Sequence, residues 1–497
     1  MKRLNILLTL TTSFILITSP LMGIGSFNDK EISFAIENEL QINTTTPSYL
    51  IDVSTFDGIV TLKGSVNNIL AKERAAKIAR SVKGVRGVIN DIDVDTPFLT
   101  NKELEKNIKT ALINDPATDS WEIKVDAKSG IVTLSGIVDS WQEKQLAAYV
   151  TKGTKGVKDV KNNIAIEYKY SRPDVDIKHD IVQMLHNDIR VDDALINVEV
   201  TNGKVHLSGT VGSANEKALA IANAWSIGII EVEADDLKIH DWARNEALYK
   251  NKYIVKTNEE LKDAVSDAFL FDPRVNSFNP KINVNNGIIT LTGQVDNLKA
   301  KNAAASDARN IVGVHKVRNY LKVRPMVIPE NKDLESTLET AFDMNPIVDI
   351  WDINVKANKG VIYLNGTVDS YFEKYKAEDI ASKTKGVIAV DNNLKVYNNN
   401  DYFFKNYYGW NSYYPPYQIN VTALYKSDDQ IKEDIESQLW WSPYVNEDQV
   451  AVIVNEGNVI LKGTVDTRRE KLFAEINALE GGAKNVDNQL KVSNDIN

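Results

Sequence analysis

Glycines recur at a fixed spacing six times along this chain. In each set, a glycine in an expected tight turn is followed by a second glycine six residues later and by a third after nineteen or twenty more. The first two glycines of the sets are Gly58/Gly64, Gly130/Gly136, Gly203/Gly209, Gly287/Gly293, Gly360/Gly366 and Gly457/Gly463. Self-similarity at this period predicts one small unit used six times, which leaves little room for a single large catalytic domain.

The second unit shows the expected elements clearly. Apolar residues at helical spacing predict helices over residues 102–113 and 141–152. Alternation of apolar and polar residues predicts strands over 122–126, 131–138 and 160–167. The predicted order is therefore helix, strand, strand, helix, strand.

Two glycines of this unit have expected backbone roles. Gly130 lies between the first two strands, where a tight hairpin turn favours positive φ. Gly136 lies late in the second strand, where a missing side chain indicates a bulge or a close approach of another backbone segment.

The repeats resemble the BON domain in their motifs around these glycines. Four of them read "GIVTLKGSV" with "GVRGVINDIDV", "GIVTLSGIV" with "GVKDVKNNIAI", "GIITLTGQV" with "GVHKVRNYLKV", and "GVIYLNGTV" with "GVIAVDNNLKV". The third and sixth carry "GKVHLSGTV" and "GNVILKGTV" but differ before the last strand, where Ala234 or Asp235 replaces the usual Asn of the third repeat. The resemblance implies an α+β chain, a tandem array of six small domains in which a three-stranded mixed sheet packs on two helices. It also implies a periplasmic or envelope protein, similar to osmotically inducible proteins, and it brings no catalytic residues.

The expected domain boundaries follow from the repeats. They are a signal peptide over 1–25, BON-like units over 28–95, 101–167, 174–240, 256–325, 330–397 and 427–493, a linker over 241–255 and an aromatic-rich linker over 398–426.

The six units fall into two sets of three. Repeats 1 and 4 share "VNNILAK" and "VDNLKAK", repeats 2 and 5 share a Trp nine residues before the turn glycine, and repeats 3 and 6 share the shorter glycine spacing. This pattern indicates that a three-repeat segment was duplicated.

The N-terminus has the features of an export signal. Lys2 and Arg3 precede an apolar run over residues 4–17, and Gly23 and Gly25 supply small residues for cleavage. The run is short for a membrane span, so secretion with cleavage of 1–25 is favoured over anchoring. A periplasmic location is therefore expected, with peripheral contact to a membrane as a further option.

Composition excludes several classes of site. The chain has no Cys, which excludes disulfides and thiol chemistry, and its net charge of −10 disfavours nucleic-acid binding. The five histidines, among them His179 and His186, lack further ligands at motif spacing, so no metal or other cofactor is expected. No nucleophile elbow or phosphate loop is present, and an enzyme is not expected.

A basic strand in repeat 4 is the main candidate binding site. The period of a strand places Lys316, Arg318, Tyr320, Lys322 and Arg324 on one face, with the intervening Val317, Leu321 and Val323 directed inward. Such a stripe can bind an anionic phospholipid surface. Alternatively it is a solvated face, or it docks on the acidic equivalent strand of repeat 1, which carries Asp91, Asp93 and Asp95, in the same or a neighbouring molecule.

Two further segments allow more than one interpretation. Residues 398–426 hold ten aromatic residues around Pro415 and Pro416, which suits either a membrane interface or, preferably, a connector packed on repeats 5 and 6. A run of Lys and Arg between Lys72 and Arg86 is expected to form the solvated outer face of a helix.

These patterns together predict a non-catalytic bacterial envelope protein. The leading hypothesis is binding to anionic phospholipid in support of envelope integrity or osmotic stress tolerance. The alternative is a periplasmic scaffold or chaperone-like protein that binds other envelope proteins.

Overall fold

A computed structural model describes the chain over residues 27–493, apart from 43–49, 116–117, 119–122, 169–171, 226–227, 245–247, 249–251, 253–255, 273, 276–277, 369–370, 397–426 and 484. The expected signal peptide and the aromatic-rich linker lie outside the described residues.

Every repeat has the predicted order of helix, strand, strand, helix, strand. The elements of the first half are α1 (Asp29–Ile42), β1 (Ile51–Phe56), β2 (Ile59–Val66), α2 (Ile69–Arg80) and β3 (Gly87–Val94); α3 (Asn101–Asn114), β4 (Ile123–Lys128), β5 (Ile131–Val138), α4 (Trp141–Lys152) and β6 (Asp159–Ile166); α5 (Asp174–Asn187), β7 (Ile196–Thr201), β8 (Lys204–Val211), α6 (Ala214–Asn223) and β9 (Glu231–Ile239). Those of the second half are α7 (Asn258–Phe271), β10 (Lys281–Asn285), β11 (Ile288–Thr292), β12 (Gln294–Val295), α8 (Leu298–Arg309), β13 (Lys316–Asn319) and β14 (Lys322–Val323); α9 (Asn331–Asp343), β15 (Ile353–Asn358), β16 (Val361–Val368), α10 (Tyr371–Lys383) and β17 (Ala389–Val396); α12 (Asp428–Trp441), β18 (Val450–Asn455), β19 (Asn458–Val465), α13 (Arg468–Glu480), β20 (Asn485–Asn488) and β21 (Lys491–Val492). Short 3-10 helices lie at η2 (Asp193–Leu195), η3 (Asp241–Arg244), η6 (Ile350–Asp352) and η8 (Glu447–Gln449).

Each repeat builds a mixed sheet with the hairpin's second strand in the centre. In repeat 1 the strand order is β1-β2-β3, with β1 antiparallel and β3 parallel to β2. The last strand of repeats 4 and 6 is divided in two, as β13/β14 and β20/β21. The α+β class and the tandem array of two-helix, three-stranded domains are confirmed.

The hairpin turn is fixed by the first residue of the preceding helix. In repeat 1 both turn residues, Asp57 and Gly58, have positive φ, at 48° and 70°, as a type I′ turn requires. Their backbone N–H groups donate to the Asp29 carboxylate at 2.9 Å. Asp174 and Asp428 accept from both turn residues in the same way, and an Asn side chain accepts from the first turn residue in the other repeats: Asn101, Asn258 and Asn331.

An asparagine ties the last strand to the second helix. Asn90 donates from Nδ2 to the carbonyl of Lys72 at 2.8 Å and accepts from the backbone N–H of Ile92. The equivalent residues are Asn162, Asn319, Asn392 and Asn488. Repeat 3 lacks this asparagine, and its β8/β9 register shifts between His206 and Ser208. The repeat whose sequence departs from the motif before its last strand therefore has a local irregularity at this strand of its sheet.

In four of the sets the second glycine allows a close backbone approach, as predicted. At Gly366 φ is 139°, and a Cβ atom would lie 2.0 Å from the carbonyl oxygen of Asp352. Gly64, Gly209 and Gly463 show the same conflict with the residue before their own hairpin. Gly293 differs, because the nearest atom to its Cβ position is 3.8 Å away at a φ of 121°.

This difference gives a stability prediction. Gly366→Ala should lower the free energy of unfolding by at least about 2 kcal/mol more than Gly293→Ala, because both carry φ strain but only the first forces backbone atoms apart. Urea unfolding followed by circular dichroism measures both. Equal losses would show that the contact with Asp352 is not what requires glycine.

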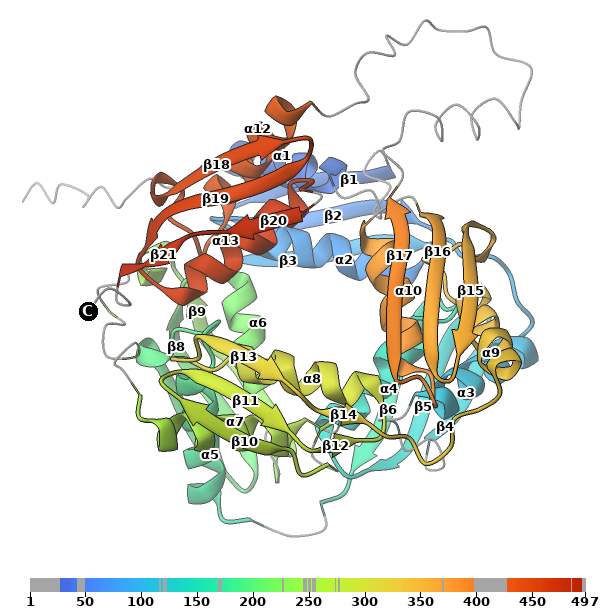
Figure 1. Cartoon of the computed structure of the whole chain (residues 1–497). Helices are drawn as coiled ribbons and strands as arrows, with labels where there is room; N and C mark the ends of the chain where they lie inside the picture. The colour runs from blue at the N-terminus through green and yellow to red at the C-terminus, as the bar shows by residue number, and fades with distance from the viewer. Residues whose placement is uncertain are drawn as a thin grey trace, which may run out of the picture.

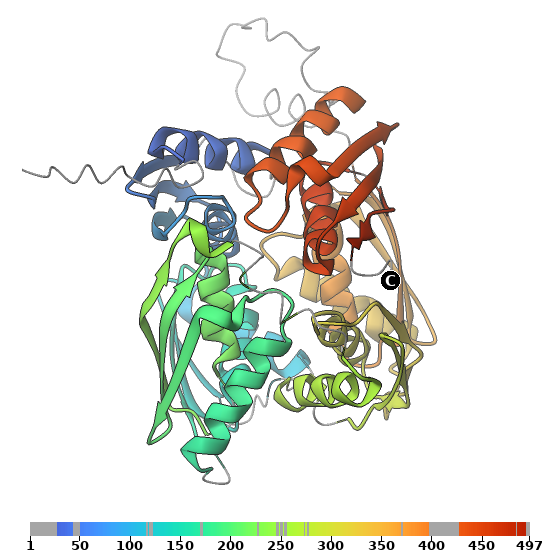
Figure 2. The same cartoon turned by 90° about the vertical axis from the view of Figure 1, so that its left-hand side faces the viewer.

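The repeats form two layers, with sheets outside and helices between them. Figure 2 shows repeats 1–3 (blue to green) on one side and repeats 4–6 (yellow to red) on the other, and Figure 1 looks onto the sheets of repeats 4–6. Six core clusters correspond to the six repeats, with only isolated residues shared between neighbours.

None of the described helices combines the length and the apolar composition needed to cross a bilayer.

One backbone hydrogen bond recurs where the layers meet. The residue before the third glycine of one repeat donates its backbone N–H to a carbonyl of another repeat, at the end of that repeat's first helix or just beyond it. These bonds run from Lys83 to Trp441 (3.0 Å), from Lys155 to Met344 (2.7 Å) and from Val312 to Asn187 (2.8 Å). Repeats 1:6, 2:5 and 4:3 are thereby paired. Because repeat 1 pairs with 6 as repeat 4 pairs with 3, the pairing agrees with a duplicated three-repeat segment.

Candidate functional site

The predicted basic strand lies on the outer side of the repeat 4 sheet. Lys316, Arg318, Tyr320, Lys322 and Arg324 are all exposed, Tyr320 to 61%. Val317 is half-buried, and Leu321 and Val323 are buried in the repeat 4 core. The structure thus places these side chains on the faces that the two-residue period predicted.

Local hydrogen bonds hold this strand in place across its interruption. Asn319 donates to the carbonyl of Lys301 in α8 at 2.7 Å and accepts from the N–H of Leu321 at 3.2 Å. Lys322 donates its N–H to Gly293 at 3.0 Å. The alternation of exposed and buried residues therefore continues from β13 into β14.

Neighbouring strands extend the positive surface. Lys281 lies opposite Thr292, and Arg318 pairs with Thr290, so their side chains share one side of the sheet. The outward positions of the described strands β10 to β14 hold no Asp or Glu; they are Lys281, Asn283, Asn285, Ile288, Thr290, Thr292, Gln294, Lys316, Arg318 and Lys322. We call Lys281, Lys316, Arg318, Tyr320, Lys322 and Arg324 the basic face.

An exposed apolar pair follows the basic face directly. Met326 is 94% exposed and Val327 is 73% exposed, two and three residues after Arg324. Sequence reasoning missed this pair, because two apolar residues beside a proline carry no periodic signal. It also missed Lys281, whose place beside the strand depends on the sheet register.

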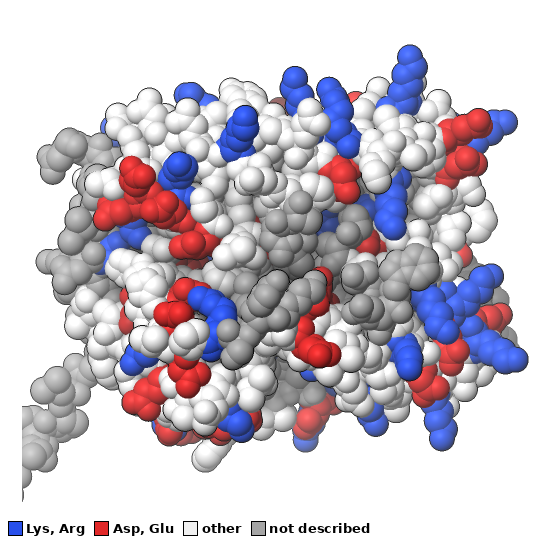
Figure 3. All heavy atoms as spheres, turned by 90° about the horizontal axis from the view of Figure 1, so that it is seen from below, with Lys and Arg blue, Asp and Glu red and all other residues white. Residues whose placement is uncertain are grey.

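The outer sheet surfaces of repeats 1 and 3, in the opposite layer, carry mainly acidic side chains. The outer side of repeat 1 presents Asp52, Asp91, Asp93 and Asp95 against Lys63. On repeat 3, the exposed strand residues Glu199, Glu231, Glu233 and Asp236 are acidic as well. Figure 3 views the molecule from below, where Lys and Arg side chains project along the upper edge and also, among Asp and Glu, from the right and lower edges. The outer sheet surface of repeat 4 is therefore basic, and those of repeats 1 and 3 are acidic.

The predicted docking of the basic strand on repeat 1 is not tested by these contacts. β3 and β13 belong to opposite layers, and the ion pairs found in the described part of the chain do not join Asp91, Asp93 or Asp95 to the basic face. A contact between repeats 1 and 4, within or between molecules, stays a prediction.

The expectation of a solvated outer face for the basic run of repeat 1 was wrong. Its helix, α2, lies between the layers, where Arg74 contacts Glu480 at 3.0 Å and Lys83 contacts Glu447 at 3.3 Å. Burial lowers the pKa of Lys83, and the nearby Glu447 opposes this shift. The charges that spread around this helix serve contacts with repeat 6, which a helix read in isolation cannot reveal.

Two of the histidines lie beside carboxylates. His186 Nδ1 lies 3.0 Å from Asp193, and His206 Nε2 lies 3.4 Å from Asp236. Within the described residues no group of three or more His, Asp or Glu side chains is arranged to hold a metal ion.

Comparisons with known proteins agree with the geometry of the repeats. The BON domain family matches residues 28–96, 100–168, 173–239, 257–325, 330–398 and 427–494. Osmotically-inducible protein Y of Escherichia coli is 30% identical over 156 residues, which cover 30% of this chain and 78% of that protein. The outer membrane lipoprotein DolP of Haemophilus influenzae is 34% identical over 116 residues, which cover 22% of this chain and 58% of that protein.

A solved structure is also similar. CdsD, a structural protein of the Type III secretion system of Chlamydia trachomatis, aligns over 40% of this chain and 90% of its own at 17% identity, with a TM-score of 0.12. That score is too low to support an argument. The family matches, by contrast, span most of the chain and coincide with its six helix–strand–strand–helix–strand units. The chain therefore belongs to the BON domain family.

Proposed function

We propose that this protein is a non-catalytic component of the bacterial envelope that adheres to anionic phospholipid through the basic face of repeat 4. Its relatives support a place in the envelope, since one is named as osmotically inducible and another as an outer membrane lipoprotein. The proposed location is the periplasm, with peripheral contact to a membrane, and the proposed role is support of the envelope under osmotic stress.

The observation that carries the proposal is the cluster of five cations without a carboxylate on one sheet surface. Lys281, Lys316, Arg318, Lys322 and Arg324 are exposed together. Each Lys or Arg near an anionic bilayer contributes about 1 kcal/mol of attraction, which salt weakens. The acidic outer side of repeats 1 and 3 would be repelled, so the molecule would bind in one orientation.

The apolar pair beside the basic face supports the same partner. Met326 and Val327 extend from the end of the sheet that carries Arg324. Side chains of this kind gain about 1–3 kcal/mol when they leave water, and the acyl boundary of a bilayer offers that environment. Tyr320, with a polar hydroxyl on an apolar ring, is suited to the headgroup level.

Vesicle flotation tests the proposal. The protein should float with vesicles of phosphatidylcholine and phosphatidylglycerol at low salt, float less at high salt, and not float with phosphatidylcholine alone. Replacing Lys316, Arg318, Lys322 and Arg324 by Gln should weaken binding about a thousandfold, because four cations are lost.

A matched control removes four cations from the other layer. Lys63, Lys124, Lys128 and Lys161 are exposed on the sheets of repeats 1 and 2, and their replacement by Gln should leave flotation unchanged. Equal loss in both variants would show that only net charge matters. A wild-type protein that never floats would overturn the proposal and leave the scaffold or chaperone-like function.

A further inference from the structure

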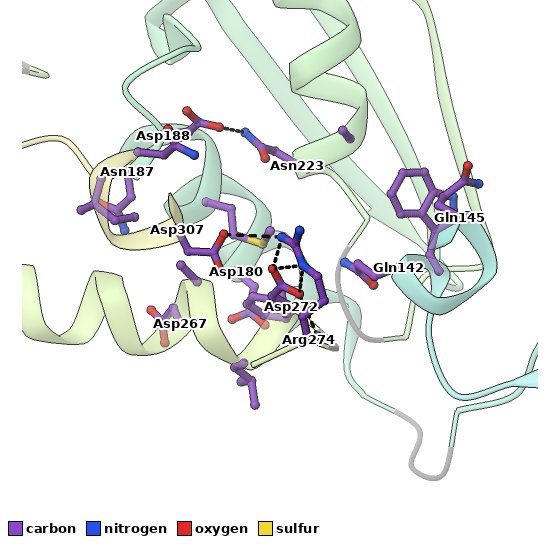
Figure 4. A pocket seen from close by; sticks show the side chains of 18 of the residues that line it. Gln142, Gln145, Asp180, Asn187, Asp188, Asn223, Asp267, Asp272, Arg274 and Asp307 are labelled. Carbon is purple, nitrogen blue, oxygen red and sulfur yellow. Dashed lines mark hydrogen bonds and ion pairs between the residues drawn. The ribbon is translucent and has the colours of Figure 1, made fainter. Parts of the chain in front are cut away.

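A cavity of about 960 Å³ lies between the two layers, where repeats 2, 3, 4 and 5 meet. Helices α4, α5, α7, α8 and α10 form most of its wall. Figure 4 shows Gln142 of α4 on one side and the cluster of Asp272, Arg274 and Asp307 on the other. This volume lies at the upper end of the range of about 300–1,000 Å³ for small-ligand sites.

The cations of the wall are already paired. Arg172 contacts Asp180 at 2.6 Å, Arg190 contacts Asp188 at 2.7 Å, Lys383 contacts Asp379 at 2.7 Å and Lys299 contacts Asp115 at 2.8 Å. The Arg274 guanidinium donates to Asp272 at 2.8 Å through Nε. Every Lys and Arg of the described cavity wall thus has a carboxylate partner, so the cavity is poorly suited to an anionic headgroup.

Two further carboxyl groups of the wall have raised pKa values, and that of Asp307 is raised far enough to favour its neutral form. Burial and the neighbouring Asp272 raise the pKa of Asp307 well above its usual range, and Arg274 lies 3.9 Å from its Oδ1. Burial, Asp180 and Asp263 raise the pKa of Asp267. A neutral carboxyl group both donates and accepts hydrogen bonds. The wall therefore offers polar groups with little net charge to attract a metal ion or a polyamine.

Side-chain amides and an aromatic ring complete the wall. The side-chain amides of Gln145 in repeat 2 and Gln183 in repeat 3 make no hydrogen bond with the described part of the chain. Gln142 donates to the carbonyl of Trp225 at 2.8 Å and keeps its amide oxygen as an acceptor. Trp141 lines the cavity and stacks on Trp225, with ring centroids 5.2 Å apart.

We propose that this cavity binds a neutral, polyhydroxylated ligand of the oligosaccharide class. Sugar hydroxyls donate and accept in turn, which matches the amides Gln142, Gln145 and Gln183, and the apolar face of a sugar ring packs on an aromatic ring such as Trp141. The ligand needs no charge, in agreement with the paired cations. The proposal is independent of the membrane site, which lies on the outer side of the sheets.

Isothermal titration calorimetry with maltotriose and diacetylchitobiose as neutral probes tests this inference on the full chain. At least one probe should bind, and Gln145→Ala with Gln183→Ala should weaken binding about tenfold or more, because two amide partners are lost. Gln294→Ala removes an exposed amide from the outer sheet surface of repeat 4 and should leave affinity unchanged.

Three outcomes would overturn the inference. The first is no heat from either neutral probe at about 10 mM, a concentration that reveals even millimolar affinity. The others are equal affinity in the double variant, and tighter binding of spermidine or inositol hexakisphosphate than of the sugars. Circular dichroism confirms that each variant is folded. Because vesicle flotation of the double variant should remain normal, failure here is distinguishable from failure of the proposed membrane function.

Discussion

Replacing Arg469 by Met is expected to cost about 3–5 kcal/mol of stability, because it leaves a buried carboxylate without its cation. Arg469 of repeat 6 contacts Asp192 of repeat 3, and the two side chains are only 5% and 3% exposed. Burial and Asp192 raise the pKa of the adjacent Glu216 to about 7, and Arg469 opposes this shift. Without Arg469, one of these two acids has to keep a proton, so the defect should be smaller at pH 5 than at pH 8.

Urea unfolding at the two pH values measures this effect. Arg86→Met is the matched control, because Arg86 forms an exposed pair with Asp57 at 2.7 Å, with 47% and 73% of the side chains exposed, and should cost less than about 1 kcal/mol. Adding Asp192→Asn to Arg469→Met should restore most of the stability. Equal losses for the two arginines would mean that the contact between repeats 3 and 6 contributes little.

The fold within a repeat was predictable because its determinants are local. A positive φ at Gly58 and the backbone contact at Gly64 each demand glycine, so the spacing of these residues records the hairpin directly. The helices and strands follow from periodicity over short windows. Even the irregular sheet of repeat 3 was signalled by the missing asparagine.

The assembly of the repeats was not predictable, because its contacts join residues far apart in sequence. Arg74 meets Glu480, and Lys299 meets Asp115, through charges that look the same as solvated charges in a single helix. The connection expected over 241–255 shows the same limit. Its Lys252 is buried and donates to the carbonyl of Leu185 at 2.9 Å, although a lysine in a linker normally indicates exposure.

Only part of the candidate membrane site was predictable, because the rest depends on contacts between residues far apart in sequence. The alternation from Lys316 to Arg324 depends on one strand and was confirmed as an outward face, whereas Lys281 joins it only through the register of β10 with β11. The cavity between the layers gave no sequence signal, because its wall combines helices from four repeats. Because charged helix faces are buried between the two layers, the ionisation of some of their side chains affects the stability of the fold.

Glu39 is the clearest of these groups, and its replacement by Gln should make the protein more stable at pH 8. Burial raises the pKa of Glu39 to about 8, where α1 meets repeat 6 and Gln438 donates to its carboxylate. In the unfolded chain the group titrates near 4.5. The folded protein therefore holds this proton more tightly, so the contribution of Glu39 is fully present below about pH 4.5 and is lost as the pH rises to about 8. One pH unit corresponds to about 1.4 kcal/mol, so the total reaches roughly 5 kcal/mol, of which about 4 kcal/mol is already lost at pH 8.

Glutamine resembles the protonated acid, and this sets the expected pattern. Glu39→Gln should match the wild type at pH 5 and exceed its free energy of unfolding by up to about 4 kcal/mol at pH 8. Glu37→Gln removes an exposed carboxylate from the same helix and controls for the change in net charge of α1. Urea titrations at pH 5, 6, 7 and 8 give the slopes. The contrary result is a Glu39→Gln variant that is less stable than the wild type by the same amount at every pH. Glu39 would then be ionised throughout, and its carboxylate, which accepts from Gln438, would be the form that stabilises the contact between repeats 1 and 6.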